Sequence, residues 1–101
     1  MADQLFMFLA LGVAEQSTDY RPGARHALMI FVTASSLQAA RLQAVEFVSR
    51  RGWCAVDLRR EKSIGVDASG ISDDILKAAA ETAMQSDGAV IVYAEEVPAD
   101  S

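Results

Sequence analysis

The chain repeats one pattern twice: a strand-like run, a helix-like run, a glycine, and a second strand-like run. The first copy is ALMIFVTA, SLQAARLQAVEFVSRR, Gly52 and WCAVDLR. The second is KSIGV, DDILKAAAETAMQS, Gly88 and AVIVYAEE. A glycine at each helix–strand junction suits the left-handed residue that ends many helices. Two strand–helix–strand units in so short a chain predict a small α+β domain.

The order of strands depends on residues 62–66. If they return as a strand after a hairpin with its tip at Arg60 and Glu61, the order is βαββαβ. That order resembles the ferredoxin-like split sandwich, in which two helices cover one face of an antiparallel sheet. If residues 62–66 form a loop, the alternative is a small βαβαβ α/β domain with a parallel sheet. We predict the ferredoxin-like form.

The apolar run LFMFLALGVA, residues 5–14, is compatible with a strand or a helix. Its aromatic residues Phe6 and Phe8 and its shortness favour a buried strand. A helix needs about 20 apolar residues to span a bilayer. A secretory signal would carry positive charge before the apolar run, whereas the first basic residue here is Arg21. We expect no membrane partner and an additional N-terminal strand, placed at a sheet edge or paired with another subunit.

Both helices show an apolar arc in the sequence. In the first helix, capped by Ser35, the arc contains Leu37, Ala40, Ala44, Phe47 and Val48. Arg41 falls inside this arc. It either extends its charge out to solvent or makes a buried ion pair or a ligand contact. For the second helix, capped by Ser72, the predicted inner face is Ile71, Ile75, Ala78, Ala79 and Thr82.

Size and composition predict a single globular domain over residues 1–101, with 51% hydrophobic and 23% charged residues. The only cysteine is Cys54, which excludes an intramolecular disulfide and fits a reducing, cytoplasmic location. One cysteine and one histidine cannot complete a structural zinc site, so no metal is expected. No Walker A, GxGxxG, CxxC, HExxH or GxSxG motif occurs, so no cofactor is expected.

Charge is unevenly distributed along the chain. The net charge is −5, but residues 41–62 carry +3 and residues 63–101 carry −7. An acidic chain repels phosphate backbones, so no nucleic-acid partner is expected. The acidic second half motivates one functional hypothesis: an inhibitor or immunity-type protein that binds a basic partner.

Few side chains are candidates for catalysis. His26 is the only imidazole, and a general base must accept a proton near neutral pH. Tyr20 and Asp57 are its candidate helpers. Arg21 and Arg25 lie within the same seven-residue stretch as Tyr20 and His26, and they are candidates for gripping an anionic ligand.

The run WCAVDLR alternates in polarity. Regular alternation places Trp53, Asp57 and Arg59 on one face, and Cys54, Val56 and Leu58 on the core face. The first set suits a ligand-binding surface or a dimer interface. Trp53 and Arg59 are therefore further candidate ligand contacts. Arg41, which falls inside the apolar arc of the first helix, is another.

These observations favour a non-catalytic, homo-oligomeric module that binds a protein or a small ligand. A sheet covered on one side invites a partner on the other, so a homodimer through the open sheet face is expected. The first alternative is a small cofactor-independent enzyme with a cavity on the sheet face that uses His26.

Overall fold

The computed structural model describes residues 3–65, 71–86 and 88–97. In chain order the elements are β1 (Gln4–Ala14), β2 (Arg25–Ala34), α1 (Leu37–Ser49), β3 (Trp53–Gly65), α2 (Asp74–Gln85) and β4 (Ala89–Glu96). The chain has the predicted α+β class, and the N-terminal apolar run is a strand as predicted.

The four strands form one antiparallel sheet in the order β3-β1-β2-β4. This order differs from that of the ferredoxin-like sandwich. Residues 53–65 form one continuous strand, and Arg60 and Glu61 pair with β1 instead of forming a hairpin tip. The predicted hairpin is therefore wrong: residues 62–65 are extended as predicted, but they continue β3 instead of returning as a separate strand, and Val66 lies outside the described residues. The parallel βαβαβ alternative is also wrong, because every strand pair is antiparallel.

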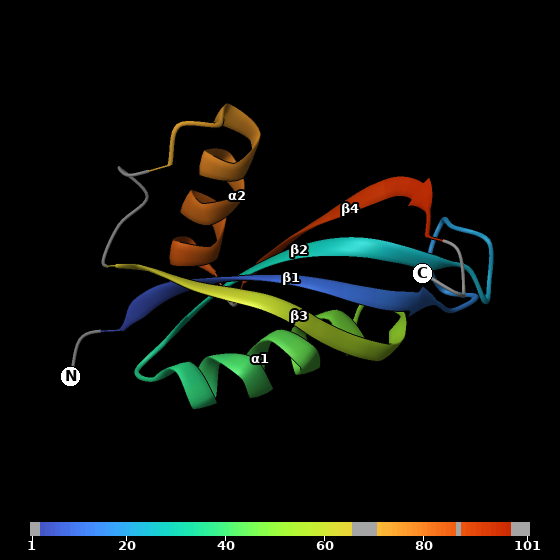
Figure 1. The fold of residues 1–101 in the computed structure, drawn as a ribbon, viewed down its shortest axis with the longest axis horizontal. Coiled ribbons are helices and arrows are strands. Elements are labelled where there is room, and N and C mark those ends of the chain that lie inside the picture. Colours follow the sequence, from blue (N-terminus) through green and yellow to red (C-terminus); the bar gives the residue numbers. More distant parts are fainter. Residues whose placement is uncertain (1–2, 66–70, 87, 98–101) are drawn as a thin grey trace.

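β1 lies in the middle of the sheet, between β2 and β3 (Figure 1). The prediction that this strand extends an edge or pairs with another subunit is wrong. Its sequence explains the central position. Leu5 to Leu9 are all apolar, so both faces of the strand favour burial, which a central strand provides.

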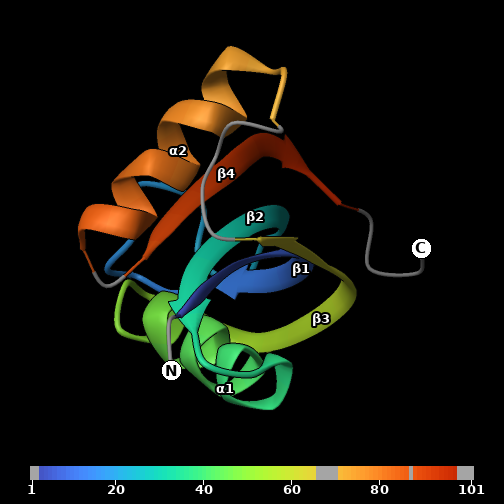
Figure 2. The ribbon, with the colours of Figure 1, turned by 90° about the vertical axis from the view of Figure 1, so that its left-hand side faces the viewer.

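The two helices cover opposite faces of the sheet (Figures 1 and 2). α1 packs on the face formed by even-numbered residues of β1, such as Phe8, where Leu28 and Ile30 also lie. α2 packs on the face formed by odd-numbered residues, against Leu5 and Phe31. The expectation of two helices on one face is wrong, because the sheet has an apolar side on each face. We call these the α1 face and the α2 face.

The α1 helix buries the predicted arc. Ala40, Ala44, Phe47 and Val48 are buried, and Leu37 packs at the margin of the same cluster. The cap differs by one residue from the prediction, because the Ser36 hydroxyl accepts the hydrogen bond from the Ala39 N–H. In α2 the cap is likewise Asp73 instead of Ser72.

A bulge in β3 changes which side chains point into the core. Ala55 has φ of +48°, and the three steps of β3 from Cys54 to Asp57 span only the two steps of β1 from Val13 to Leu11. An extra residue reverses the alternation at that point. Trp53 is therefore buried on the α1 face with Leu58, while Cys54 is exposed. The predictions that Cys54 faces the core and that Trp53 faces outward are wrong for this reason.

Glycines at three junctions match their local geometry. The Ala24 N–H donates a hydrogen bond of 3.0 Å to the Arg21 carbonyl oxygen, which closes the predicted turn. Gly23 supplies the positive φ, +85°, that the turn requires. Gly52 ends the α1 segment at φ +94°, as predicted. Gly88 acts by close packing instead, since a Cβ there would lie 2.9 Å from the Phe31 carbonyl oxygen.

The strained backbone at Ala55 predicts an unusual response to glycine. A left-handed alanine costs about 1–2 kcal/mol, and glycine relieves that cost. We expect Ala55→Gly to leave the free energy of unfolding unchanged or to raise it by up to about 1 kcal/mol. The matched control, Ala27→Gly in β2, should lower it by about 0.5–1 kcal/mol. Urea titration followed through the fluorescence of Trp53 measures both, and equal destabilisation by the two changes would contradict the prediction.

Candidate functional site

Three aromatic rings meet at the end of the sheet beside the β1–β2 loop. The ring centroids of Tyr20 and His26 are 4.6 Å apart, and those of His26 and Trp53 are 5.6 Å apart. Gly12 leaves room for this cluster, because a Cβ there would lie 3.3 Å from the Trp53 ring and 2.9 Å from Leu28. The sequence predicts that Tyr20 lies near His26 but does not predict that Trp53 joins them.

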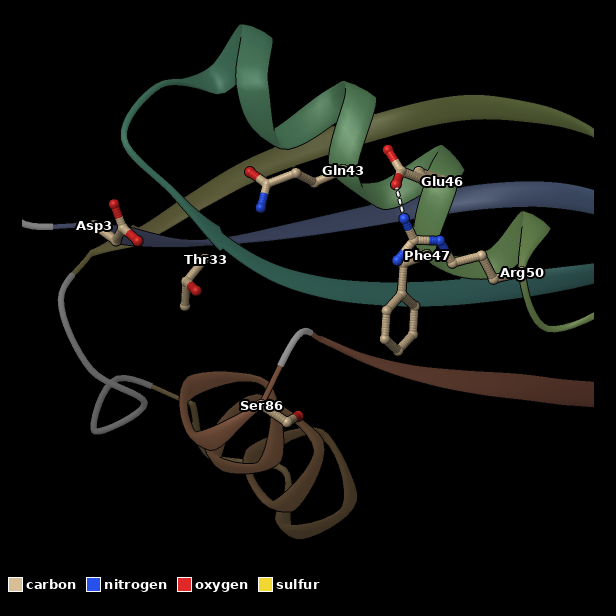
Figure 3. Close-up of a pocket in the computed structure, with 7 residues that line it drawn as sticks. All are labelled: Asp3, Thr33, Gln43, Glu46, Phe47, Arg50 and Ser86. Atoms are coloured by element: carbon tan, nitrogen blue, oxygen red, sulfur yellow. Dashed lines mark hydrogen bonds and ion pairs between the residues drawn. The ribbon is translucent and has the colours of Figure 1, made fainter.

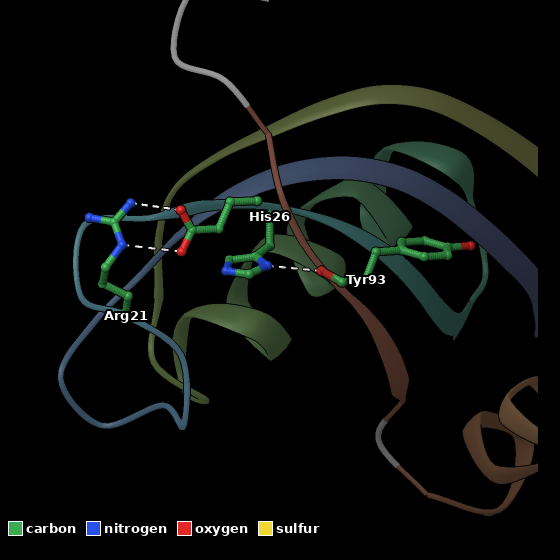
Figure 4. Close-up of polar contacts among 4 residues, drawn as sticks. Arg21, His26 and Tyr93 are labelled. Atoms are coloured by element: carbon green, nitrogen blue, oxygen red, sulfur yellow. Dashed lines mark hydrogen bonds and ion pairs between the residues drawn. The ribbon is translucent and has the colours of Figure 1, made fainter.

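His26 is buried within β2, with 1% of its surface exposed. Its Nδ1 lies 2.8 Å from the carbonyl oxygen of Tyr93 (Figure 4). A carbonyl oxygen only accepts, so Nδ1 carries a proton and donates it in this hydrogen bond. Nε2 is buried and has no hydrogen-bond partner among the described residues. Such an atom costs about 1–3 kcal/mol of stability.

Arg21 forms a two-point ion pair with Glu96 at the surface (Figure 4). The guanidinium Nη2 and Nε lie 2.7 and 3.1 Å from the two carboxylate oxygens. These hydrogen bonds lower the pKa of Glu96 and outweigh the opposing effect of burial. The pair joins the β1–β2 loop to the end of β4. Arg25 follows in β2 and also has an interaction partner.

Asp57 does not approach His26. It lies opposite Leu11 on the α2 face, whereas His26 packs with Trp53 on the α1 face. The Asp57 carboxylate instead pairs with Arg59, at 3.0 Å between Oδ2 and Nε, and both side chains are exposed. The structure therefore brings Tyr20 and Trp53 to His26 but places Asp57 and Arg59 elsewhere.

Arg41 extends from α1 to β3. Its guanidinium Nε lies 2.9 Å from Oε1 of Glu61, with a second contact from Nη2 to Oε2. Both side chains are partly exposed, 49% and 31%. Arg41 thus reaches out of the apolar arc to a surface ion pair that joins a helix to an edge strand.

The hollow drawn in Figure 3 lies between α1 and the end of α2, with a volume of about 290 Å³. Asp3, Thr33 and Gln43 line one side, and Phe47 and Ser86 line another. Its remaining lining residues, Glu46 and Arg50, neutralise each other as an i,i+4 ion pair. A wide, shallow hollow whose charges are mostly paired offers little to orient a ligand.

The α2 face is only partly covered by α2. The helix packs at the end near Leu5 and Phe31. Beyond it lies a continuous apolar surface of partly exposed side chains: Leu9, Leu11, Val13, Ala27 and Met29. Leu9, Leu11 and Val13 pack into neither buried cluster. We call this surface the open face.

Two cations border the open face along β3. Arg60 lies opposite Leu9, and Lys62 lies opposite Met7. Neither has an ion-pair partner in the part of the chain that the structure describes. Arg41, Arg50 and Arg59 all have one. The alternation of β1 could have identified the apolar row, but the cations' position follows from the bulges of β3.

A second apolar surface lies on α2 itself. The predicted inner face is only partly right: Ile71 and Ala79 pack against the sheet, but the helix buries Ala80 and Ala83 and not Ile75, Ala78 or Thr82. Ile75 is 69% exposed, and Ala78 and Thr82 are exposed beside it. We call these three residues the outer stripe. The apolar arc of α2 in the sequence is therefore wider than the surface that the sheet covers.

Within the described ranges, no cluster of three or more His, Cys, Asp or Glu side chains is placed to bind a metal ion. Neither described helix has the length and apolar character needed to cross a bilayer. Comparisons of the chain with protein-family models, with curated proteins and with solved structures gave no match.

The Arg41–Glu61 pair predicts a pH-dependent stability. Hydrogen bonds from Arg41 lower the pKa of Glu61 below its ordinary value of 4.5, although burial opposes this. A lowered folded-state pKa gives stability that is present above pH 4.5 and is lost as pH falls through the folded-state value. We expect Glu61→Gln to be less stable than the wild type at pH 7, with the difference closing at acid pH and in high salt.

Denaturant titrations between pH 7 and pH 3 measure this difference. Glu15→Gln is the control, because Glu15 is exposed and no described cation pairs with its carboxylate. A gap between wild type and Glu61→Gln that stays constant from pH 7 to pH 3 would refute the prediction.

Proposed function

We propose that the chain is a non-catalytic interaction module that self-associates through the open face. The observation that carries the proposal is the apolar surface of Leu9, Leu11, Val13 and Ala27, which pack into neither buried cluster, together with Met29 at the margin of the α2 cluster. A contiguous apolar surface with a polar border is typical of a protein–protein contact. Arg60 and Lys62 provide that border on one side.

The location of other exposed apolar side chains supports the same face. Of the four large hydrophobic residues that are markedly exposed in the described part of the chain, Ile75 and Met84 lie on α2 and Tyr93 lies on β4. Only Leu42 lies on α1. The side of the sheet that carries α2 therefore presents more apolar surface to solvent than the α1 side. A second copy that covers it would bury the side chains that this chain leaves exposed.

The geometry around His26 favours this module over a hydrolytic or isomerising enzyme. A general base must come within hydrogen-bond reach of a substrate proton, but His26 is buried beneath Tyr20 and Trp53. Asp57, its candidate helper, lies on the other face of the sheet. A substrate would have to displace the aromatic cluster before it met Nε2.

The acidic second half supports a rival binding hypothesis, in which a basic protein is the partner. Asp74 and Glu81 are exposed on α2 and available to such a partner. The open face argues for self-association instead. Its apolar side chains are bordered by Arg60 and Lys62, and the acids of α2 that could pair with these cations belong to the same chain. A self-complementary surface of this kind does not need a second protein species.

Removing apolar surface from the open face should weaken self-association. We expect Leu9→Thr/Leu11→Thr to raise the dimer dissociation constant at least tenfold, about 1.4 kcal/mol, while threonine keeps the β-propensity of the strand. The matched control is Leu42→Gln, which removes a 70% exposed leucine from α1. Light scattering coupled to size exclusion and sedimentation equilibrium measure the association.

The fluorescence of Trp53, the only tryptophan, checks that each variant is folded. A wild-type chain that remains monomeric at high concentration would refute self-association. A threonine variant that dimerises as tightly as the wild type would move the contact away from the open face.

A further inference from the structure

We propose that the open face of one copy receives α2 of a second copy, and that the contact is reciprocal. This inference rests on the proposed self-association and names the surface that fills the open face. α2 covers one end of its own α2 face and leaves the other end bare. When two sheets approach face to face in opposite directions, each α2 can lie over the bare end of the other sheet.

The first support is the outer stripe of α2. Ile75 is 69% exposed at one margin of the apolar arc of α2, and Ala78 and Thr82 continue the stripe along the helix. An amphipathic helix normally turns its apolar arc towards its own core. Here the sheet takes only the side of the arc that contains Ala80 and Ala83. The remaining side of the arc can pack on an apolar surface of another molecule, and the open face of a second copy is such a surface.

The second support is charge complementarity. The open face is bordered by Arg60 and Lys62, which have no ion-pair partner among the described residues. α2 carries the acids Asp74 and Glu81 and one cation, Lys77, on the same side of the helix; all three are exposed and have no ion-pair partner in those ranges, so this side of α2 is acidic by one charge. Each surface has apolar side chains with charged residues beside them. The opposite charges of the two surfaces favour one mutual orientation over others.

The third support is closure. A two-fold contact uses the same pair of surfaces twice, so two copies satisfy both open faces and both outer stripes. Repeated head-to-tail contacts would instead build closed rings or open chains of more than two copies. The inference therefore predicts a dimer and no larger species.

A small amphipathic anion is the rival occupant. Met7, Leu9 and Met29 form a hollow of about 290 Å³ with Arg60, Glu61 and Lys62. A fatty acid could place its chain on the methionines and its carboxylate near the cations. It would leave the outer stripe of α2 exposed, so the second copy accounts for more of the surface.

Charge reversal tests the inference. One variant carries Arg60→Glu/Lys62→Glu, and the other carries Asp74→Lys/Glu81→Lys. Each should dimerise at least tenfold more weakly than the wild type, because like charges then face each other. An equimolar mixture of the two should form a heterodimer, in which both reciprocal contacts pair opposite charges: one contact carries the wild-type signs and the other carries the reversed signs. The quadruple variant, which keeps the wild-type net charge, should form homodimers again.

Sedimentation equilibrium measures every species, and Arg50→Glu on α1 is the control for a charge change on the other side of the sheet. Ile75→Gln gives an independent test, since the residue is mostly exposed and its replacement should weaken dimers without unfolding the chain. Octanoate added to the wild type should not displace the second copy at concentrations below its micelle-forming range.

The results of these experiments distinguish a failure of α2 docking from a failure of the proposed self-association. If the wild type dimerises but both charge-reversal variants dimerise equally well, self-association stands and docking of α2 is refuted. If the two variants are monomers and their mixture stays monomeric, the acids and cations do not face each other and the inference fails. If octanoate converts dimers to monomers by binding the hollow, the open face is a ligand site instead.

Discussion

The double pairing of β1 is the constraint on which the rest of the structure depends. β1 hydrogen-bonds to β2 on one side and to β3 on the other, and its side chains alternate between two apolar faces. Even-numbered residues hold α1 through the core around Phe8, and odd-numbered residues hold α2 through Leu5. Because a strand has period two, β1 contributes side chains to the cores beneath both helices. A single-residue slip of β1 would move each of its side chains to the opposite face of the sheet.

The sequence predicts several elements well and their arrangement poorly. β1, β2, α1 and β4 follow from apolar periodicity, and the turn at Gly23 follows from its neighbours. The strand order does not follow, because pairing partners are set by long-range contacts. The sequence does not predict the continuous strand β3, since charged residues such as Arg60 and Glu61 are typical of a turn. In an edge strand those residues simply face solvent or pair with α1.

The candidate site shows the same limit. Neighbours in sequence, such as Tyr20 and His26, could be expected to meet. The arrival of Trp53 depends on a bulge at Ala55, and a bulge has no clear signal in one sequence without glycine. The open face cannot be predicted from the sequence, because the apolar arc of α2 does not show which part of that arc the sheet covers. Contacts made through irregular backbone or incomplete coverage are thus the least predictable from local pattern.

The irregular backbone of β3 limits how copies of this chain can meet. β3 is an edge strand, and its pairing with β1 shifts register at three points. A bulged strand that also carries Arg59, Arg60 and Lys62 presents an uneven row of backbone groups, which does not match a second straight strand. Extension of the sheet across β3 into a neighbouring molecule is therefore disfavoured. Growth into fibrils by strand addition is blocked on this side, and contact through a face remains open.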